Sequence, residues 1–389
     1  MKISKEFNEA EELNTAPRFT KVTNHQMRGR WRALTGDAGA NNALDPDRYL
    51  EAMREVDLSG DEILSKIISP KFPGLTPAKF EWEQWYEAAE KMAHLTNELD
   101  PTITNAVVHI PTDKPIAFMN TGDWHIGSRF VAYKTFRCLM DLILDTERVY
   151  MANYGDETDN FPMDWLPPAI QQIITPKAQR LLVEAMVERM IAKGKLLWSF
   201  WSNHHAFTER KIGENLMAPM FMGKVPFFHG KGVIRFKIGA EEETAEEYII
   251  YASHEFTGSS VYNINHPQMK ALLWEVPQAD FVIMGDKHKY GYTEVSHHDN
   301  SYYAGLHKNH IAHLLQVGTA KTGPDHYSIR GWSAGMFEWP IFILYPDKHV
   351  IKRAYDFADL EHFLGVTLDK RLLRRLQDAA EEEGVKHAR

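Results

Sequence analysis

Short apolar runs alternate with segments of helical periodicity from about residue 115 onward. Apolar runs of this length are typical of buried strands, and apolar positions spaced three or four apart are typical of helices. Strands that alternate with helices, followed by a strand-rich second half, predict an α/β fold of two packed, mixed β-sheets flanked by helices. The predicted strands are 115–121, 148–154, 196–202, 231–239, 246–253, 279–284 and several within 289–355, and the predicted helices lie near 131–146, 176–193, 207–217, 267–275 and 368–383.

The N-terminal part of the chain has a different pattern. Residues 1–45 show no regular periodicity, whereas residues 46–100 show helical spacing and predict an N-terminal helical extension. The stretch Arg18–Arg32 carries five basic residues and no acid. Such a stretch can hold phosphates, although a solvated arm or a strap over the main domain explains it more simply.

These patterns divide the chain into an N-terminal arm and helical extension at 1–110, a main α/β domain at 111–357 and a C-terminal helical tail at 358–389. The sequence leaves open whether the extension recognises a partner or substrate or only packs against the main domain.

Composition narrows the class of protein. The chain has 389 residues, 44% of them hydrophobic and 25% charged, as is usual for soluble globular proteins. A net charge of −9 gives no overall basic field for nucleic acid or anionic membranes. The single cysteine, Cys138, excludes an intramolecular disulfide framework. Because there is no apolar signal core and no run of about 18 apolar residues, we expect a cytoplasmic protein without membrane association.

Polar residues that can bind metals follow five of the predicted strands. Turns favour Asp, Asn and Gly, which explains some of these residues, but turns do not favour His. Groups at the ends of neighbouring strands in α/β sheets lie close together, and mixed carboxylate and imidazole ligands suit Mn, Fe or Zn. The five segments are Asp123-Trp124-His125, Gly155-Asp156, Asn203-His204, His254 and Gly285-Asp286-Lys287-His288.

In this order, the five segments resemble the motifs of the calcineurin-like metallophosphoesterases. Those motifs are Asp-x-His, Gly-Asp, Gly-Asn-His-Asp/Glu, a lone His and Gly-His-x-His. The resemblance covers about residues 115–355. Within the family, the sequence is similar to phage and bacterial members, including the DNA-repair exonuclease branch. Three positions depart from the pattern: Ser202 replaces Gly, His205 replaces an acid, and Asp286 replaces the first His of the last motif.

The resemblance implies a pair of divalent metal ions, with Mn²⁺ expected first and Fe, Zn or Mg as alternatives. Two ions about 3.5–4 Å apart clamp a phosphate and activate a hydroxide between them. The implied ligands are Asp123, His125 and His288 for the first ion, Asn203, His254 and Asp286 for the second, and Asp156 as the bridge.

Further roles follow from the same resemblance. His204 corresponds to the catalytic histidine, which donates a proton to the leaving group or stabilises phosphoryl charge. Arg129 and His205 are candidates for substrate binding, although an exposed Arg and a supporting His are the simpler interpretations.

The expected activity is metal-dependent hydrolysis of a phosphate ester. DNA is the first substrate hypothesis, because of the motif context at 122–128 and the basic stretch Arg18–Arg32. A nucleotide or protein phosphoester is the alternative, and the net charge of −9 favours a small substrate. A non-catalytic binding or scaffold protein on a phosphoesterase fold is a third hypothesis, suggested by Asp286. A homodimer is expected by analogy alone.

Overall fold

The computed structural model describes Tyr86 and residues 104–162, 168–212, 215–258, 260, 262–298, 309–323, 335 and 337–385. The arm at 1–45, its basic stretch Arg18–Arg32 and the helices expected within 46–100 lie outside the described residues. The chain divides into two compact units, Met1–Pro101 with Thr208–Glu214, and Thr102–Phe207 with Asn215–Arg389. Almost all described residues belong to the second unit.

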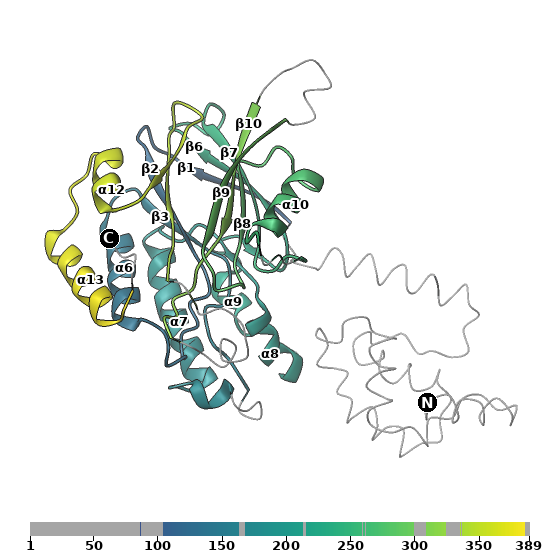
Figure 1. Cartoon of the computed structure of the whole chain (residues 1–389), viewed down its shortest axis with the longest axis vertical. Coiled ribbons are helices and arrows are strands. Elements are labelled where there is room, and N and C mark those ends of the chain that lie inside the picture. Colours follow the sequence, from purple (N-terminus) through teal and green to yellow (C-terminus); the bar gives the residue numbers. More distant parts are fainter. Residues whose placement is uncertain are drawn as a thin grey trace, which may run out of the picture. The chain divides into compact units, whose positions relative to one another are not determined.

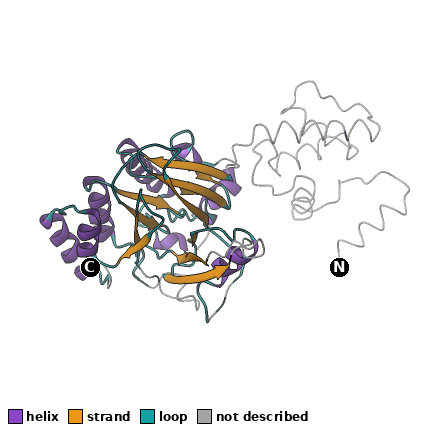
Figure 2. Ribbon diagram, turned by 90° about the horizontal axis from the view of Figure 1, so that it is seen from above, coloured by secondary structure: helices purple, strands orange, loops and turns teal. Residues whose placement is uncertain are grey.

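Two mixed β-sheets form the centre of this second unit (Figure 2). The larger sheet has the strand order β1-β6-β7-β8-β10-β9, and the smaller has the order β12-β11-β2-β3. A short two-stranded sheet pairs β4 with β5. The strands are β1 Asn105–Ile110, β2 Ile116–Thr121, β3 Val149–Asn153, β4 Ser199–Phe200, β5 Phe227–Phe228, β6 Gly232–Ile238, β7 Glu246–Ser253, β8 Phe281–Met284, β9 Gly291–His298, β10 Asn309–Gln316, β11 Ile341–Leu344 and β12 Ile351–Ala354.

Both sheets combine parallel and antiparallel pairs. In the larger sheet β1 with β6, β7 with β8 and β8 with β10 run parallel, whereas β6 with β7 and β9 with β10 run antiparallel. In the smaller sheet β2 and β3 run parallel, and β11 runs antiparallel to β2 and β12. The predicted fold class, α/β with two mixed sheets and helices, is confirmed.

Helices lie outside the sheets (Figures 1 and 2). They are α6 Tyr133–Asp145, α7 Pro176–Ala192, α8 Asn203–Ile212, α9 Ala218–Phe221, α10 His266–Trp274, α12 Phe357–Leu364 and α13 Lys370–Glu382, with the 3₁₀ turn Pro168–Gln171. The yellow C-terminal helix α13 packs beside α6 and buries Leu372, Leu376, Ala379 and Ala380 along one face. Within the described residues, no helix combines the length and apolar character that crossing a membrane requires.

Aromatic rings from both sheets build the core. Phe118 of β2 lies 5.4 Å from Phe236 of β6 and 6.2 Å from Phe281 of β8, measured between ring centroids. Phe281 in turn lies 5.0 Å from Phe342 of β11. Every residue of β2 is buried, because both faces of the strand are covered. This explains why its sequence is a continuous apolar run rather than an alternating one.

Several predicted elements differ from the structure. The strand expected at 196–202 is reduced to β4, and the helix expected at 207–217 begins instead at Asn203 and is followed by the separate helix α9. Ser202 precedes α8, and Ser and Asn are residues that start helices, so the polar Ser202-Asn203 pair marks a helix start.

The strands β1 and β5 have no predicted counterpart, and α12 is a separate helix at the start of the predicted C-terminal helical tail. The strand β1, which falls within the expected N-terminal extension, pairs along its full length with β6 in the larger sheet. The helix α12 follows β12, where Asp356 accepts a hydrogen bond from the Asp359 amide at its start. Gly365 ends α12 in the left-handed conformation, with φ of 62°.

Candidate metal centre

The predicted ligands follow the C-terminal ends of neighbouring parallel strands. In the register of the smaller sheet Thr121 of β2 is level with Asn153 of β3, and in the larger sheet Ser253 of β7 is level with Met284 of β8. Strands that end level with each other release the following residues at one edge. These are Asp123 and His125 after β2, Asp156 after β3, His254 after β7, and Asp286 and His288 after β8, with Asn203 and His204 at the start of α8.

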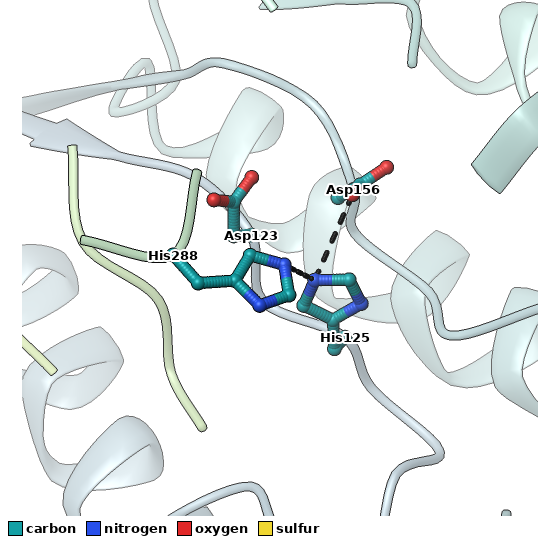
Figure 3. Close-up of side chains that lie close together, drawn as sticks. All are labelled: Asp123, His125, Asp156 and His288. Atoms are coloured by element: carbon teal, nitrogen blue, oxygen red, sulfur yellow. Dashed lines mark hydrogen bonds and ion pairs between the residues drawn. The ribbon is translucent and has the colours of Figure 1, made fainter. Parts of the chain in front are cut away.

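Four of these side chains form a first cluster (Figure 3). Asp123, His125, Asp156 and His288 each offer one ligand atom, and these atoms all lie within 4.8 Å of one another. The two imidazoles face each other, with 2.7 Å between His125 Nε2 and His288 Nε2. His125 Nε2 also lies 3.6 Å from Asp156 Oδ2. The arrangement gathers the ligands expected for the first ion.

The other carboxylate oxygen of Asp156 faces a second group. Asp156 Oδ1 lies 3.5 Å from His254 Nε2, and the same nitrogen lies 3.3 Å from Asn203 Oδ1. His254 Nδ1 lies 2.6 Å from the carbonyl oxygen of Tyr154. Because a carbonyl only accepts hydrogen bonds, Nδ1 carries the proton and Nε2 is left to face the cluster. Asp156 therefore stands between the two predicted ligand sets.

The backbone at the site is strained. Asp123, His125, Asp156, Asp286 and His288 all have positive φ angles, between 48° and 68°. Asp and His are among the few residues besides Gly that tolerate this region. Sparsely populated backbone conformations that persist together are concentrated at functional sites. The residue types in the motifs therefore serve both the backbone turns and the ligand set.

Gly155 explains the Gly-Asp pairing in the second motif. Its φ is 92°, and an added Cβ would lie 2.7 Å from His254 Nδ1 and 2.9 Å from Ser202 Cβ. Any side chain here would collide with the loop that carries His254. The close backbone approach is what brings the strand ends within reach of each other.

Asp156 and His254 determine each other's protonation. Burial by itself raises the pKa of a carboxyl group, but the imidazoles of His204 and His254 outweigh it and lower the pKa of Asp156 to about 2. Burial by itself lowers the pKa of an imidazole, but the carboxylates of Asp156 and Asp123 outweigh it and raise the pKa of His254 to about 9. A cation at this position would therefore replace a proton on His254.

His125 and Asp123 lie in surroundings that disfavour their charged forms. Burial, followed by the ammonium of Lys321 and the imidazole of His288, holds the pKa of His125 well below its usual value. The ring is therefore neutral, which is the form that binds metals. Burial raises the pKa of Asp123 well above its ordinary value against the opposing charge of His254, and Asp156 raises it further. A divalent cation would supply the charge that keeps this carboxylate ionised.

The residues fit a metal on direct geometric grounds. Asp123 Oδ2 and Asp156 Oδ1 are buried and have no hydrogen-bond partner within the part of the chain that the structure describes. Buried polar atoms without partners are costly and rare, so each points to a missing ligand. The facing nitrogens of His125 and His288 likewise need a shared proton or a shared ion between them. Oxygen and imidazole donors together suit a divalent transition metal.

His204 lies at the start of α8, beside Asp156. Its Nδ1 lies 2.6 Å from the backbone oxygen of Asp159, so Nδ1 carries the proton and Nε2 is directed toward the cluster. His204 Nε2 lies 3.7 Å from Asp156 Oδ2. The rings of Phe161 and Phe207, whose centroids lie 5.0 and 4.7 Å from that of His204, fix the imidazole in place.

The carboxylate of Asp159 lies against Nδ1 of His125, the ring nitrogen opposite the one that faces His288. Asp159 Oδ1 lies 3.2 Å from His125 Nδ1 and 3.2 Å from the ammonium of Lys321, which is 2% exposed. The structure places the carboxylate of Asp159 against His125 and its backbone oxygen against His204. Lys321 was not anticipated, because a single Lys far along the chain carries no motif.

Replacing Asp159 with Asn should weaken metal binding at the first cluster. The substitution removes the charge that orients the His125 ring, and carboxylates that orient ligating histidines contribute roughly 10- to 100-fold to metal affinity. Isothermal titration of the metal-free chain with Mn²⁺ measures this change. Asp347, an exposed acid with the same substitution to Asn, is the control and should bind as the unchanged chain does. Equal affinities for both variants would contradict the role of Asp159.

His205 is completely buried and paired with an acid. Its Nε2 lies 2.6 Å from Glu157 Oε2, and both side chains are 0% exposed. The other oxygen of Glu157 accepts hydrogen bonds from Asn153 and Ser199, at 2.6 and 2.8 Å. A buried, paired imidazole does not reach a substrate, so the structure favours a supporting role over the substrate-binding role expected for His205. The pair joins the segment after β3 to the start of α8.

Replacing His205 with Ala should destabilise the fold. Breaking one partner of a buried pair typically costs about 3–5 kcal/mol, because the remaining charge stays buried without compensation. Denaturant unfolding measures the loss. Adding Glu157→Gln to the His205→Ala variant should recover part of it, since the uncompensated charge is then removed. A direct substrate-binding role would instead raise KM and leave the free energy of unfolding unchanged.

Arg129 is exposed, and its guanidinium lies 4.7 Å from the ring centroid of Phe130. Its substrate-binding role stays a prediction.

Comparisons with known proteins give structural likeness only. No protein-family model and no curated protein matches the chain. It is similar to the solved structure of a metallophosphoesterase from Sphaerobacter thermophilus, with 12% identity, a TM-score of 0.30, and coverage of 68% of this chain and 100% of that one. The calcineurin-like phosphoesterase YfkN from Bacillus subtilis gives 9% identity, a TM-score of 0.29, and coverage of 70% and 98%. Vps29 from Chaetomium thermophilum gives 9% identity, a TM-score of 0.32, and coverage of 61% of this chain and 96% of that one. At these identities a likeness concerns the fold at most, so the chemistry must follow from the site itself.

Proposed function

We propose that the chain is a metal-dependent phosphoesterase with a two-metal site bridged by Asp156. The observation that carries the proposal is the position of that carboxylate: Oδ2 faces His125 at 3.6 Å and Oδ1 faces His254 at 3.5 Å. A carboxylate whose two oxygens face two separate ligand sets is suited to bridge two ions. The clustering of strained, buried Asp and His residues around it supports the same function.

The residues divide into two ligand sets with distinct tasks. Asp123, His125 and His288 would hold one ion, and Asn203, His254 and Asp286 would hold the other, with Mn²⁺ as the ion we expect. When bound, the pair of ions supplies Lewis-acid charge to a phosphoryl group and makes water acidic enough to react near neutral pH. The chain itself orients these ligands. The carboxylate of Asp159 contacts Nδ1 of His125, and the backbone oxygen of Tyr154 accepts a hydrogen bond from Nδ1 of His254.

His204 would donate a proton to the leaving group or stabilise the charge on the phosphoryl group. Its Nδ1–H is held by the backbone of Asp159, and its Nε2 faces the cluster where a phosphate would lie. In the protonated form this nitrogen can donate to a departing oxygen or to a charged phosphoryl oxygen. His204 also lies at the N-terminus of α8, a ten-residue helix whose first amides favour anions.

We favour a phosphodiester substrate, with DNA as the first choice. Support comes from the sequence, which carries the basic stretch Arg18–Arg32 in addition to a phosphoesterase-like order of motifs. The net charge of −9 supports instead a small substrate such as a nucleotide. In the absence of catalysis, the same fold would serve as a binding scaffold.

A substrate panel separates these possibilities. The purified chain is incubated with Mn²⁺ and, side by side, a nitrophenyl phosphodiester, a nitrophenyl phosphomonoester, and linear single- and double-stranded DNA. The Asn203→Ala/His204→Ala variant is the control. DNA cleavage that disappears in the control supports the nuclease, whereas cleavage of the small esters alone contradicts it and supports a nucleotide or other small substrate. Metal binding without any hydrolysis supports the scaffold.

A further inference from the structure

Glu255, a donor that the motifs do not contain, lies beside two members of the second ligand set, His254 and Asp286. One ring nitrogen of His254 and one carboxylate oxygen each from Glu255 and Asp286 lie within 4.8 Å of one another. Glu255 follows His254 directly and is exposed to solvent, whereas His254 is 3% exposed. The cluster therefore extends from the buried imidazole to the surface, where an ion can enter.

A buried carboxylate oxygen of Asp156 faces the imidazole of the same cluster. Asp156 is 1% exposed, and its Oδ1 has no hydrogen-bond partner among the described residues. This oxygen lies 3.5 Å from His254 Nε2. A buried carboxylate oxygen without a hydrogen-bond partner thus faces the imidazole that Glu255 and Asp286 also approach, an arrangement that a cation would complete.

The backbone fixes Glu255 in this position. Ser253 Oγ donates a hydrogen bond to the carbonyl oxygen of Glu255 at 2.6 Å, directly after β7 ends. Asp286 is fixed in the same way, because its amide donates to Asp123 Oδ1 at 3.1 Å. The carboxylates of Glu255 and Asp286 repel each other at this separation, and a cation bound by both relieves that repulsion.

We propose that Glu255 is an additional ligand of the second metal position, and that Glu255 and Asp286 together make this position selective for Mg²⁺ and Mn²⁺ over Zn²⁺. The inference rests on the proposed two-metal function and deepens it. With Asp156 and Asn203, the position has oxygen donors from four residues and a single nitrogen donor from His254. Carboxylate and carbonyl oxygens suit hard ions, whereas imidazole suits Zn²⁺.

Lys287 modulates the same position. Its ammonium lies 2.5 Å from Asp286 Oδ2 and is partly buried. The ammonium competes with an ion for this carboxylate, because both are cations attracted to the same oxygen. Removing the charge of Lys287 and removing the charge of Glu255 should therefore have opposite effects on the second ion.

Metal titration of the full-length chain tests the proposal without relying on activity. Equilibrium dialysis with metal analysis gives stoichiometry and affinity for Mn²⁺ and Zn²⁺, and the Mn²⁺ resonance spectrum reports each bound ion. Glu255→Gln should weaken the second Mn²⁺ by about tenfold or more, since a ligand charge is lost, while Lys287→Met should tighten it. Glu243→Gln, the same substitution at an exposed acid, should leave both ions unchanged.

Asp286→His gives an independent test of selectivity. Histidine tolerates the φ of 68° at this position, so the backbone can stay as it is. Exchanging an oxygen donor for imidazole should shift the preference toward Zn²⁺ relative to Mn²⁺ by about tenfold or more.

Two results would overturn the inference. A Glu255→Gln variant that binds the second Mn²⁺ within twofold of the unchanged chain shows that Glu255 is not a ligand, and leaves the two-metal function intact. An unchanged chain that binds fewer than two ions contradicts the proposed function and this inference together. The stoichiometry of the unchanged chain therefore separates the two failures.

Discussion

Replacing Asp156 with Asn should reduce hydrolysis of a phosphodiester on the order of a thousandfold. The substitution keeps the size of the side chain but removes the charge that faces His125 at 3.6 Å and His254 at 3.5 Å. Metal ions contribute several kcal/mol to transition-state stabilisation, and about 4 kcal/mol corresponds to a thousandfold in rate. Steady-state kinetics with saturating Mn²⁺ measures the loss.

Measuring the metal content and folding of the Asp156→Asn variant shows whether the loss of activity comes from lost metal. Asp156→Asn should also lower the number of bound Mn²⁺ ions per chain, because an amide does not bridge two cations as a carboxylate does. Asp347→Asn, an exposed control, should retain both rate and metal content. A variant at position 156 that stays folded and hydrolyses the diester at the normal rate would show that Asp156 does not bridge a catalytic metal pair.

Replacing His204 with Gln should lower kcat by about 10²- to 10⁴-fold on substrates with poor leaving groups. The amide cannot supply the proton that the Nε2 of His204 would deliver from its place 3.7 Å from Asp156. An ester of nitrophenol needs little protonation of its leaving oxygen, so the same variant should lose much less activity on that ester. Kinetic measurements made in parallel on esters with poor leaving groups and on nitrophenyl esters test this difference.

Metal binding is the control for the role of His204. The His204→Gln variant should bind Mn²⁺ as the unchanged chain does, because His204 is not among the proposed ligands. His362→Gln, the same substitution at an exposed position of α12, should change neither rate. An equal loss on both classes of ester would contradict proton donation and favour stabilisation of phosphoryl charge by His204 instead.

The strand ends that carry the candidate ligands could be predicted from the sequence. Each ligand segment follows an apolar run short enough for one strand, and the Gly or Asn next to several ligands marks a turn. Asp123, Asp156 and Asp286 lie in that pattern, and the structure brings them together at distances that no single segment specifies. Short, fully apolar strands are the clearest local signal in an α/β chain.

What the sequence did not reveal depends on contacts between distant segments. Glu157 and His205 are 48 positions apart, and neither residue type by itself predicts that the two side chains are buried against each other. Lys321 reaches Asp159 from a segment with no motif. Glu255 is one acid among many, and only the turn after β7 places it beside Asp286.

Secondary structure was missed where local signals are weak. β1 has exposed positions such as Val107 and lies at the edge of its sheet, so its six residues show little of the apolar run that marks a central strand. The early start of α8 was missed because Asn203 and His204 belong to a candidate ligand segment as well as to a helix.

The most direct test of a two-metal phosphoesterase is the rate of nitrophenyl phosphodiester hydrolysis by the metal-stripped chain as Mn²⁺ is added back. The proposed function predicts no hydrolysis in chelator, a rise that reaches its plateau near two Mn²⁺ per chain, and no response in the Asn203→Ala/His204→Ala variant. Hydrolysis that persists in chelator, or that the double variant retains, would contradict a reaction at this site.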